Sequence, residues 1–288
     1  MKLPPFAYAC PTTLPEAVQL LSSRDDAKPI AGGQSLVPML AFRLAQPTLL
    51  VDLRKLADLR GIRISGKGVT LGAMVRWRDI EDDDRLDTAH PLLKAAIAHV
   101  AHYQVRNRGT VGGSLAHADP AAEMPGIVIT CDAEIAVVGK SGAHVIQAAD
   151  FFQGALTTAL VPDEIIVEVR LPAWPKGRRW GFEEFARRRG DFAMAAAAVF
   201  YDQSEDGKAR NAHVGVIGVA DRPLRLPSVE DVLNGRVIDQ AAIAEAEAAT
   251  CAAVDPQDDI HASAAYRRAL VGTMVERALK RAAARPQQ

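Results

Sequence analysis

A short glycine motif at residues 29–36 constrains this chain more than any other stretch, because its residue types suit a loop folded closely around a phosphate. Gly32 and Gly33 relieve the backbone of side-chain constraints, which permits positive φ and lets successive N–H groups point into one concavity. Gln34 and Ser35 add short polar groups beside those amides. An ordinary Gly-Gly turn is the alternative that this stretch alone leaves open. The candidate binding residues are Pro29, Ile30, Ala31, Gly32, Gly33, Gln34, Ser35 and Leu36.

A second stretch at residues 108–114 repeats this chemistry, with paired glycines and a hydroxyl residue on either side. We expect a second glycine loop here, so that the two loops together hold a diphosphate from two sides. Neither stretch matches G-x-G-x-x-G or G-x-x-x-x-G-K-[ST], so a Rossmann fingerprint and a P-loop are both unsupported. The candidate residues of the second stretch are Thr110, Val111, Gly112, Gly113 and Ser114.

The segment that follows the second stretch predicts a helix beginning at Asp119. Asp119 and Pro120 form a favourable N-cap and first-turn pair, which would carry Glu123 in the first turns of that helix. The unpaired N–H groups at such a helix start suit a pyrophosphate. The carboxylate of Glu123 has the wrong charge to bind a phosphate, and a favourable interaction with the helix dipole is the structural alternative for it.

The composition limits the class of protein. The chain has 288 residues, a length that suits two packed domains, and its 34 basic and 35 acidic residues argue against a nucleic-acid binder. Cys10, Cys131 and Cys251 lie far apart without a C-x-x-C pair, so we expect neither a disulfide framework nor a cysteine-held iron–sulfur cluster. Prolines interrupt residues 1–6 and no apolar run approaches ~18 residues, which predicts a cytoplasmic protein without a membrane span.

The clearest break in the pattern is at residues 172–177, where two prolines and a glycine interrupt any regular element. We therefore expect two domains, residues 1–174 and residues 175–288. The first domain shows a capping box at residues 13–16 that predicts a helix, and two glycine turns that predict β-hairpins. In the second domain, the expected elements are strands at residues 179–186, 193–201 and 212–219, followed by helices at 241–253 and around 266–278.

No catalytic constellation is evident in the sequence. The histidines are scattered and match neither H-E-x-x-H nor G-x-S-x-G, so we assign no catalytic residue and no metal site to this chain. The charged run at residues 79–87 is typical of a solvated face. The three arginines at 187–189 lack the interleaved aromatic residues of a nucleic-acid patch. A cofactor pocket without catalytic side chains is typical of an electron carrier, in which the cofactor does the chemistry.

The two glycine stretches, with A-H-A-D-P-A-A-E at residues 116–123 after the second, resemble the flavin subunit of molybdenum-containing hydroxylases. These are the medium chains of the carbon monoxide dehydrogenase and xanthine dehydrogenase family. The resemblance covers nearly the whole chain and implies an α+β fold. Residues 1–174 would form a two-lobed FAD-binding domain of the PCMH (vanillyl-alcohol oxidase-like) type. Residues 175–288 would form a domain like the carbon monoxide dehydrogenase flavoprotein C-terminal domain, with a three-stranded antiparallel sheet and helices.

The same resemblance implies roles for individual residues. The two glycine stretches would hold the diphosphate of an extended FAD, and Glu123 would accept a hydrogen bond from a ribose hydroxyl. Asp191 and Phe192 would lie beside the flavin ring, and Ile166 would pack on the cofactor from the adjoining domain. The segment at 187–189 is less acidic than in the xanthine dehydrogenase branch. The electron acceptor therefore stays open among a quinone, oxygen, NAD+ and others.

The resemblance also implies partners. A large subunit with a molybdenum cofactor would oxidise the substrate, and a small subunit with [2Fe-2S] clusters would pass the electrons on. The assembly would be a heterotrimer, paired as a dimer of heterotrimers. Two alternatives are a self-contained FAD-dependent oxidoreductase and a non-redox scaffold of the same fold. The sequence does not indicate which molecule is oxidised, because the pocket that selects it would lie on the large subunit.

Overall fold

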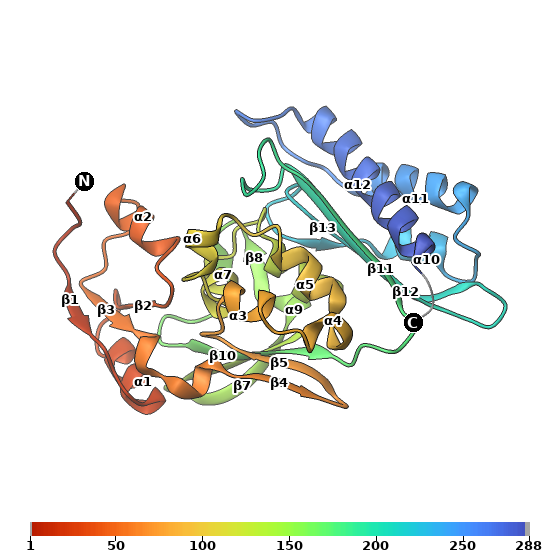
Figure 1. The fold of residues 1–288 in the computed structure, drawn as a ribbon. Helices are drawn as coiled ribbons and strands as arrows, with labels where there is room; N and C mark the ends of the chain where they lie inside the picture. The colour runs from red at the N-terminus through yellow and green to blue at the C-terminus, as the bar shows by residue number, and fades with distance from the viewer. Residues whose placement is uncertain (1, 286–288) are drawn as a thin grey trace.

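The computed structural model describes residues 2–285. Met1 and residues 286–288, at the outer ends of the two expected domains, lie outside the described part. Figure 1 shows a small N-terminal lobe in red and orange, a central lobe around a larger sheet, and a C-terminal sheet backed by the blue helices.

A three-stranded parallel sheet, in the order β1-β3-β2, organises the first lobe. Its strands are β1 (Ala7–Ala9), β3 (Leu49–Asp52) and β2 (Lys28–Ile30). The predicted helix is present as α1 (Leu14–Ser22), where the Thr13 hydroxyl caps the Glu16 N–H. Its apolar face packs on the sheet in one core cluster that includes Ala17, Val18, Leu21, Leu49 and Val51. The short helix α2 (Leu36–Ala41) follows β2, and the 3-10 turns η1 (Leu53–Lys55) and η2 (Ala57–Arg60) lead out of β3.

A five-stranded antiparallel sheet, in the order β4-β5-β10-β6-β7, organises the second lobe. Its strands are β4 (Ile62–Ser65), β5 (Gly68–Gly72), β10 (Ile165–Pro172), β6 (Glu134–Gly139) and β7 (Gly142–Gln147). The two predicted hairpins are confirmed as β4–β5 and β6–β7. The helices of this lobe are α3 (Trp77–Glu81), α4 (Leu86–Ala89), α5 (Pro91–Ile97), α6 (Tyr103–Arg106), α7 (Val111–His117), α8 (Glu123–Thr130) and α9 (Ala148–Phe151). A two-stranded ribbon of β8 (Phe152–Gly154) and β9 (Thr157–Thr158) completes it.

The C-terminal sheet has four antiparallel strands in the order β11-β12-β13-β14. They are β11 (Arg179–Phe185), β12 (Ala195–Gln203), β13 (Ala209–Ile217) and the two-residue β14 (Leu224–Arg225). The three long strands match the expectation. The expected sheet of three strands was wrong by one strand, because the short β14 also pairs with β13. The helices are α10 (Pro227–Leu233), α11 (Gln240–Ala253) and α12 (Ala264–Ala284).

The alanine-rich strand β12 is buried on both faces. Ala195, Ala197 and Val199 belong to the core under α10–α12, whereas Ala196, Ala198 and Phe200 belong to the core shared with the second lobe. Because neighbouring side chains of a strand point to opposite faces, both layers meet the same sheet. The small alanine side chains let both layers come close. The C-terminal sheet is therefore a middle layer between its own helices and the second lobe (Figure 1).

Within residues 2–285, no helix is both long and apolar enough to cross a membrane.

Candidate functional site

The first glycine stretch forms the loop between β2 and α2, as the sequence predicts. Gly33 has φ +74°, a left-handed conformation that glycine adopts without strain. The Nε2 group of Gln34 donates to the carbonyl oxygen of Gly32 at 3.2 Å and braces the loop. Within the described residues, the amides of Gly32, Gly33, Gln34 and Ser35 donate to no protein acceptor. A row of unpaired N–H groups of this kind is a site for an anion.

The two glycine stretches lie against each other. A Cβ on Gly32 would lie 2.0 Å from the carbonyl oxygen of Arg108 and 3.0 Å from Cα of Gly109. The Nε group of Arg108 also donates to the Gly32 carbonyl oxygen at 3.4 Å. On the other side, a Cβ on Gly113 would lie 3.7 Å from Cβ of Ala31. The chain thus brings together two segments far apart in sequence, and glycine at position 32 is what permits the approach.

The second glycine stretch is not a loop, and this expectation was wrong. Residues Val111–His117 form α7, and the Thr110 Oγ1 atom accepts a hydrogen bond from the Gly113 N–H at 3.2 Å. The amides of Val111 and Gly112 donate to the carbonyl oxygens of Val75 and Ala73, so they are not free for a ligand. A Cβ on Gly112 would lie 2.6 Å from Cβ of Ala73, so glycine lets the helix pack on the chain after β5. The hydroxyls of Thr110 and Ser114 remain as possible donors.

The helix expected from Asp119 begins instead at Glu123. Asp119 accepts a hydrogen bond from the Ala121 N–H in a turn, and Ala118 has φ 51°, so the chain stays non-helical until α8. The side chain of Glu123 is buried, and burial raises its pKa to about 8, with the nearby carboxylate of Glu184 adding to the effect. Glu123 is the first residue of α8, as the helix-dipole alternative requires, and its burial distinguishes it from an ordinary surface carboxylate.

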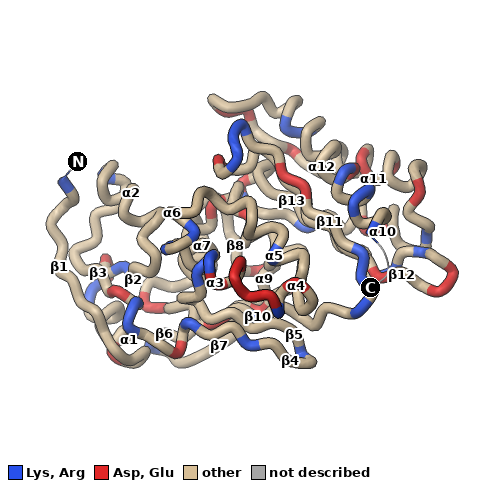
Figure 2. Tube along the Cα trace, viewed as in Figure 1, with Lys and Arg blue, Asp and Glu red and all other residues tan. Residues whose placement is uncertain are grey.

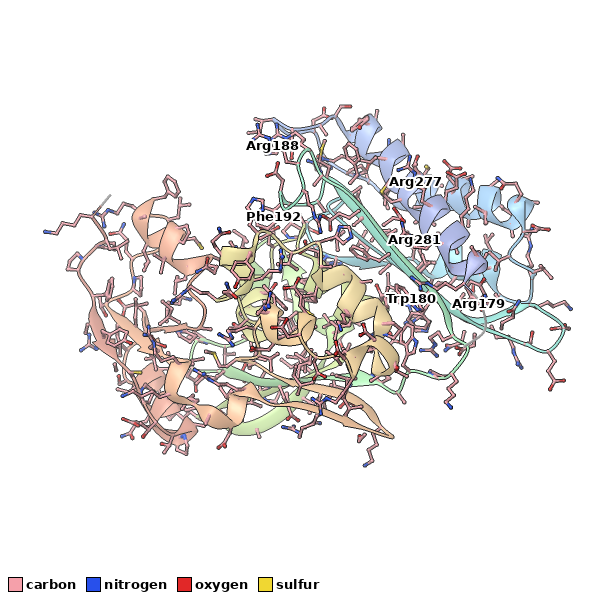
Figure 3. The ribbon with its side chains drawn as sticks, viewed as in Figure 1. Arg179, Trp180, Arg188, Phe192, Arg277 and Arg281 are labelled. Atoms are coloured by element: carbon pink, nitrogen blue, oxygen red, sulfur yellow. The ribbon has the colours of Figure 1, made fainter. Side chains whose placement is uncertain are left out.

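Asp191 and Phe192 lie in the loop between β11 and β12, and the Phe192 side chain is 64% exposed. Figure 3 shows Phe192 and Arg188 on this loop, at the end of the sheet above α6. A Cβ on Gly190 would lie 2.5 Å from Nδ1 of His102, so the loop packs on the segment that leads into α6 and the second glycine stretch. Ile166 differs from these residues, since it is 4% exposed in β10 within the core of the second lobe.

Two residues at this site were missed from the sequence. Arg108 lies in the second stretch, and we assigned no role to it from the sequence. Its position directly before the glycines could have indicated one. Glu184 gave no signal at all. Its side chain is 3% exposed, and its Oε1 atom lies 3.8 Å from Nδ1 of His99. Its Oε2 atom is buried and has no hydrogen-bond partner among residues 2–285.

These groups fit a flavin dinucleotide. The unpaired amides at 32–35 and the cationic Arg108 suit an anionic diphosphate, and the unpaired Glu184 Oε2 suits a hydroxyl or N–H donor of a ligand. In residues 2–285, no group of three or more His, Cys, Asp or Glu side chains is arranged to hold a metal ion. A crevice of about 780 Å³ lies elsewhere, next to Trp174 and Arg285, and shares no residue with the two stretches. When bound, FAD supplies the electron-transfer chemistry at this site.

Comparisons with known proteins agree with this geometry. Residues 4–174 match the FAD binding domain in molybdopterin dehydrogenase, and residues 180–282 match the CO dehydrogenase flavoprotein C-terminal domain. The chain is 40% identical to the nicotine 6-hydroxylase medium subunit of Paenarthrobacter nicotinovorans, over 99% of this chain and 100% of the relative. It is 36% identical to caffeine dehydrogenase subunit beta of a Pseudomonas species (strain CBB1), over 99% and 97%. A chain of reconstituted CO dehydrogenase from Oligotropha carboxidovorans superposes with a TM-score of 0.96 at 38% identity, over 99% and 100%.

Both family models together span most of the chain, and the relatives align along nearly their full length. The match therefore concerns both the two FAD-binding lobes and the C-terminal layer. The chain belongs to the FAD-binding medium subunits of the carbon monoxide dehydrogenase and molybdenum hydroxylase family, oxidoreductases made of several subunits.

Proposed function

We propose that this chain assembles with a large molybdenum-cofactor subunit and a small iron–sulfur subunit, paired as a dimer of heterotrimers. Electrons from the [2Fe-2S] clusters of the small subunit pass through the FAD of this chain to an external acceptor. The observation that carries the proposal is the row of unpaired amides at residues 32–35, packed on Arg108 and the start of α7. It provides a binding site for a cofactor diphosphate and no reactive group of its own.

We propose the following contacts for the cofactor. The diphosphate binds the amides at residues 32–35 and the hydroxyls of Thr110 and Ser114. Glu123 accepts a hydrogen bond from a ribose hydroxyl, and the loop with Asp191 and Phe192 lies beside the flavin ring. The packing of Ile166 on the cofactor stays a prediction. The side chain of Ile166 is enclosed in the core of the second lobe.

A self-contained flavin oxidoreductase is not favoured, because the relatives that this chain matches are named as subunits of larger enzymes. The two buried histidines already serve structural contacts. His90 accepts a hydrogen bond from the Leu93 N–H at the start of α5, and Nδ1 of His213 contacts the Thr130 carbonyl oxygen. The unpaired amide row in turn disfavours a scaffold that binds no cofactor. Figure 2 shows both charge signs interspersed along the chain, which gives no support to a nucleic-acid partner.

The substrate of the complex is set by another subunit. This chain has similar sequence identity to subunits of enzymes named for nicotine and for caffeine, at 40% and 36%, and to a chain of CO dehydrogenase, at 38%. Carbon monoxide and these two nitrogen heterocycles differ too much in size and polarity for one pocket to select all three. We infer that the medium subunit keeps the same electron-transfer role while the substrate pocket changes on the large subunit.

Purification of the tagged chain from its native host tests the proposal. We expect two companion chains, molybdenum and iron in the eluate, an absorption spectrum of oxidised flavin, and FAD in the released small molecules. Cell fractionation of the same host tests the expected cytoplasmic location. A chain that purifies alone with FAD bound would overturn the complex and leave the flavin site intact. A chain that purifies alone and takes up no added FAD would overturn both.

A further inference from the structure

The carboxyl group of Glu184 lies in the seam between the C-terminal sheet and the second lobe. Along β11, Phe182 belongs to the core shared with the second lobe, and its ring meets that of His99 at 5.1 Å. Glu184 is two residues further along the strand, so its side chain is on the same face. Glu183 points to the opposite face, where it forms an ion pair with Arg281 of α12. The two adjacent glutamates therefore have different surroundings.

The seam leaves Glu184 without a full set of partners. Its side chain is 3% exposed, and no donor in residues 2–285 reaches its Oε2 atom. The Oε1 atom faces Nδ1 of His99 at 3.8 Å, which is too long for a hydrogen bond. A buried carboxylate oxygen without a donor is costly, so this atom indicates a donor that the polypeptide does not supply.

A second carboxyl, that of Glu123, is also buried. Glu123, at the start of α8, is 6% exposed, and no lysine or arginine in the described chain forms an ion pair with it. The other titratable groups near the pair are Asp119, which adds negative potential, and His99. Burial, followed by the charge of Glu184, raises the pKa of Glu123 to about 8.

We propose that Oε2 of Glu184 is a further cofactor-binding group, accepting a hydrogen bond from a hydroxyl or ring N–H of FAD. The inference rests on the flavin site proposed above. Glu123 follows the second glycine stretch along the chain, and Glu184 shortly precedes the loop with Asp191 and Phe192, so both carboxyls come from segments that border that site.

The test measures FAD binding to the complex after its flavin is removed. For Glu184→Ala we expect the dissociation constant to rise about tenfold or more, since a charged acceptor is lost. Glu183→Ala, on the opposite face of the same strand, should change it less than about twofold. Titration with ADP locates the donor: a parallel loss places it in the adenosine half, and unchanged ADP binding places it in the riboflavin half. Equal FAD affinity in the two variants would overturn the proposed contact.

If the parent protein binds neither FAD nor ADP, the flavin site itself fails instead of the proposed contact.

Discussion

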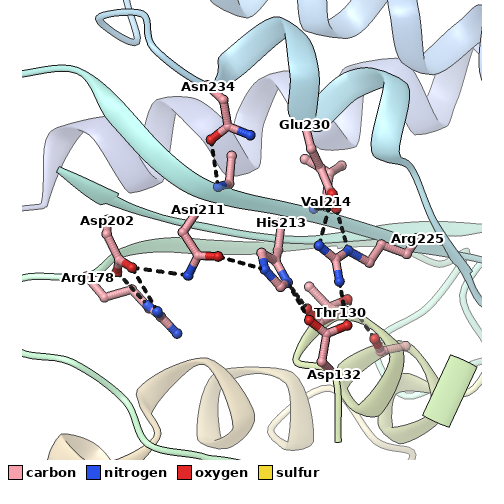
Figure 4. Close-up of polar contacts among 12 residues, drawn as sticks. Thr130, Asp132, Arg178, Asp202, Asn211, His213, Val214, Arg225, Glu230 and Asn234 are labelled. Atoms are coloured by element: carbon pink, nitrogen blue, oxygen red, sulfur yellow. Dashed lines mark hydrogen bonds and ion pairs between the residues drawn. The ribbon is translucent and has the colours of Figure 1, made fainter. Parts of the chain in front are cut away.

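The Nδ1 atom of His213 lies 2.7 Å from the carbonyl oxygen of Thr130, and this contact joins β13 to the end of α8. The other ring nitrogen, Nε2, faces Oδ1 of Asn211 at 3.3 Å, while the amide of Asn211 donates to Asp202 (Figure 4). Both ring nitrogens therefore face oxygen acceptors, although a neutral imidazole has a single N–H. We assign that N–H to Nδ1, the nitrogen with the shorter contact.

The groups around His213 have opposing effects on the pKa of its imidazole. Burial lowers the pKa of this imidazole most, and the guanidinium of Arg225 acts in the same direction. The Thr130 carbonyl and the carboxylates of Asp132 and Glu230 act to raise the pKa. The net effect is a pKa below the usual value, so the folded protein keeps His213 neutral at a pH where the unfolded chain is already protonated.

Acidification should therefore lower the free energy of unfolding through His213, and His213→Gln should make this loss smaller. The unfolded chain takes up its proton below about pH 6.5, so the stabilising contribution is complete above that pH and is lost as the pH falls. The resulting loss in the free energy of unfolding is on the order of 1 kcal/mol for each unit by which folding lowers the pKa. Calorimetric melting at pH 7.5 and 5.5 should show a smaller drop for His213→Gln than for the parent protein.

The exposed His261 provides the control for that comparison, because His261→Gln should keep the full drop. A remaining slope in His213→Gln is expected from His90, whose pKa burial lowers to about 3, which gives stability the same dependence on pH. An identical drop in His213→Gln and in the parent protein would show that this contact does not titrate on unfolding.

Gly215→Ala should destabilise the same seam by about 1–3 kcal/mol, as overpacking of a close contact does. A Cβ at this position of β13 would lie 1.8 Å from Oγ1 of Thr130. The Thr130 hydroxyl is held in place, since it donates to the Gly126 carbonyl oxygen at 2.7 Å. Chemical denaturation checks the change, with Gly61→Ala as the control because its Cβ would meet only the end of the Arg63 side chain. Equal unfolding free energies of the two variants would mean that the sheet shifts without cost.

Elements specified by neighbouring residues were predictable from the sequence. The Thr13 cap and the hairpins at Gly66 and Gly142 depend on local signals, and all appear where expected. The start of α7 was hidden, because a Gly-Gly pair is a poor helix former and only the close contact of Gly112 with Ala73 makes the glycines useful there. Tertiary packing overrides propensity at such positions.

The candidate site was predictable in part for the same reason. The composition of the motif containing Gly32 indicated exposed amides, and the structure shows them unpaired. Glu183 and Glu184 are identical in type and adjacent, and only the alternation of side chains along the strand sends one toward Arg281 and the other toward His99. No pattern within a single strand reveals which face will meet a helix located far away in the sequence.

Arg108→Ala should weaken FAD binding about tenfold at low ionic strength and less at high salt. Its guanidinium lies against the Gly32 carbonyl and next to the unpaired amides, so it adds attraction for a diphosphate without being buried. Fluorescence titration of the flavin-free complex at two salt concentrations measures the change. Lys67→Ala removes the same charge from the exposed β4–β5 turn and should leave the affinity and its salt dependence unchanged. An equal loss in both variants would indicate a general charge effect.

Gly32→Ala should abolish FAD binding at micromolar cofactor while the chain stays folded. The added methyl group would lie 2.0 Å from the backbone carbonyl oxygen of Arg108, and neither segment can yield as a flexible side chain does. The first stretch must then move away from α7, which disperses the amides that face the ligand. Gly66→Ala, where nothing lies within 4 Å of the added Cβ, is the matched control and should retain its flavin. Flavin content after purification, with circular dichroism to confirm folding, checks the prediction. A folded Gly32→Ala protein with a full complement of FAD would show that the diphosphate is held elsewhere.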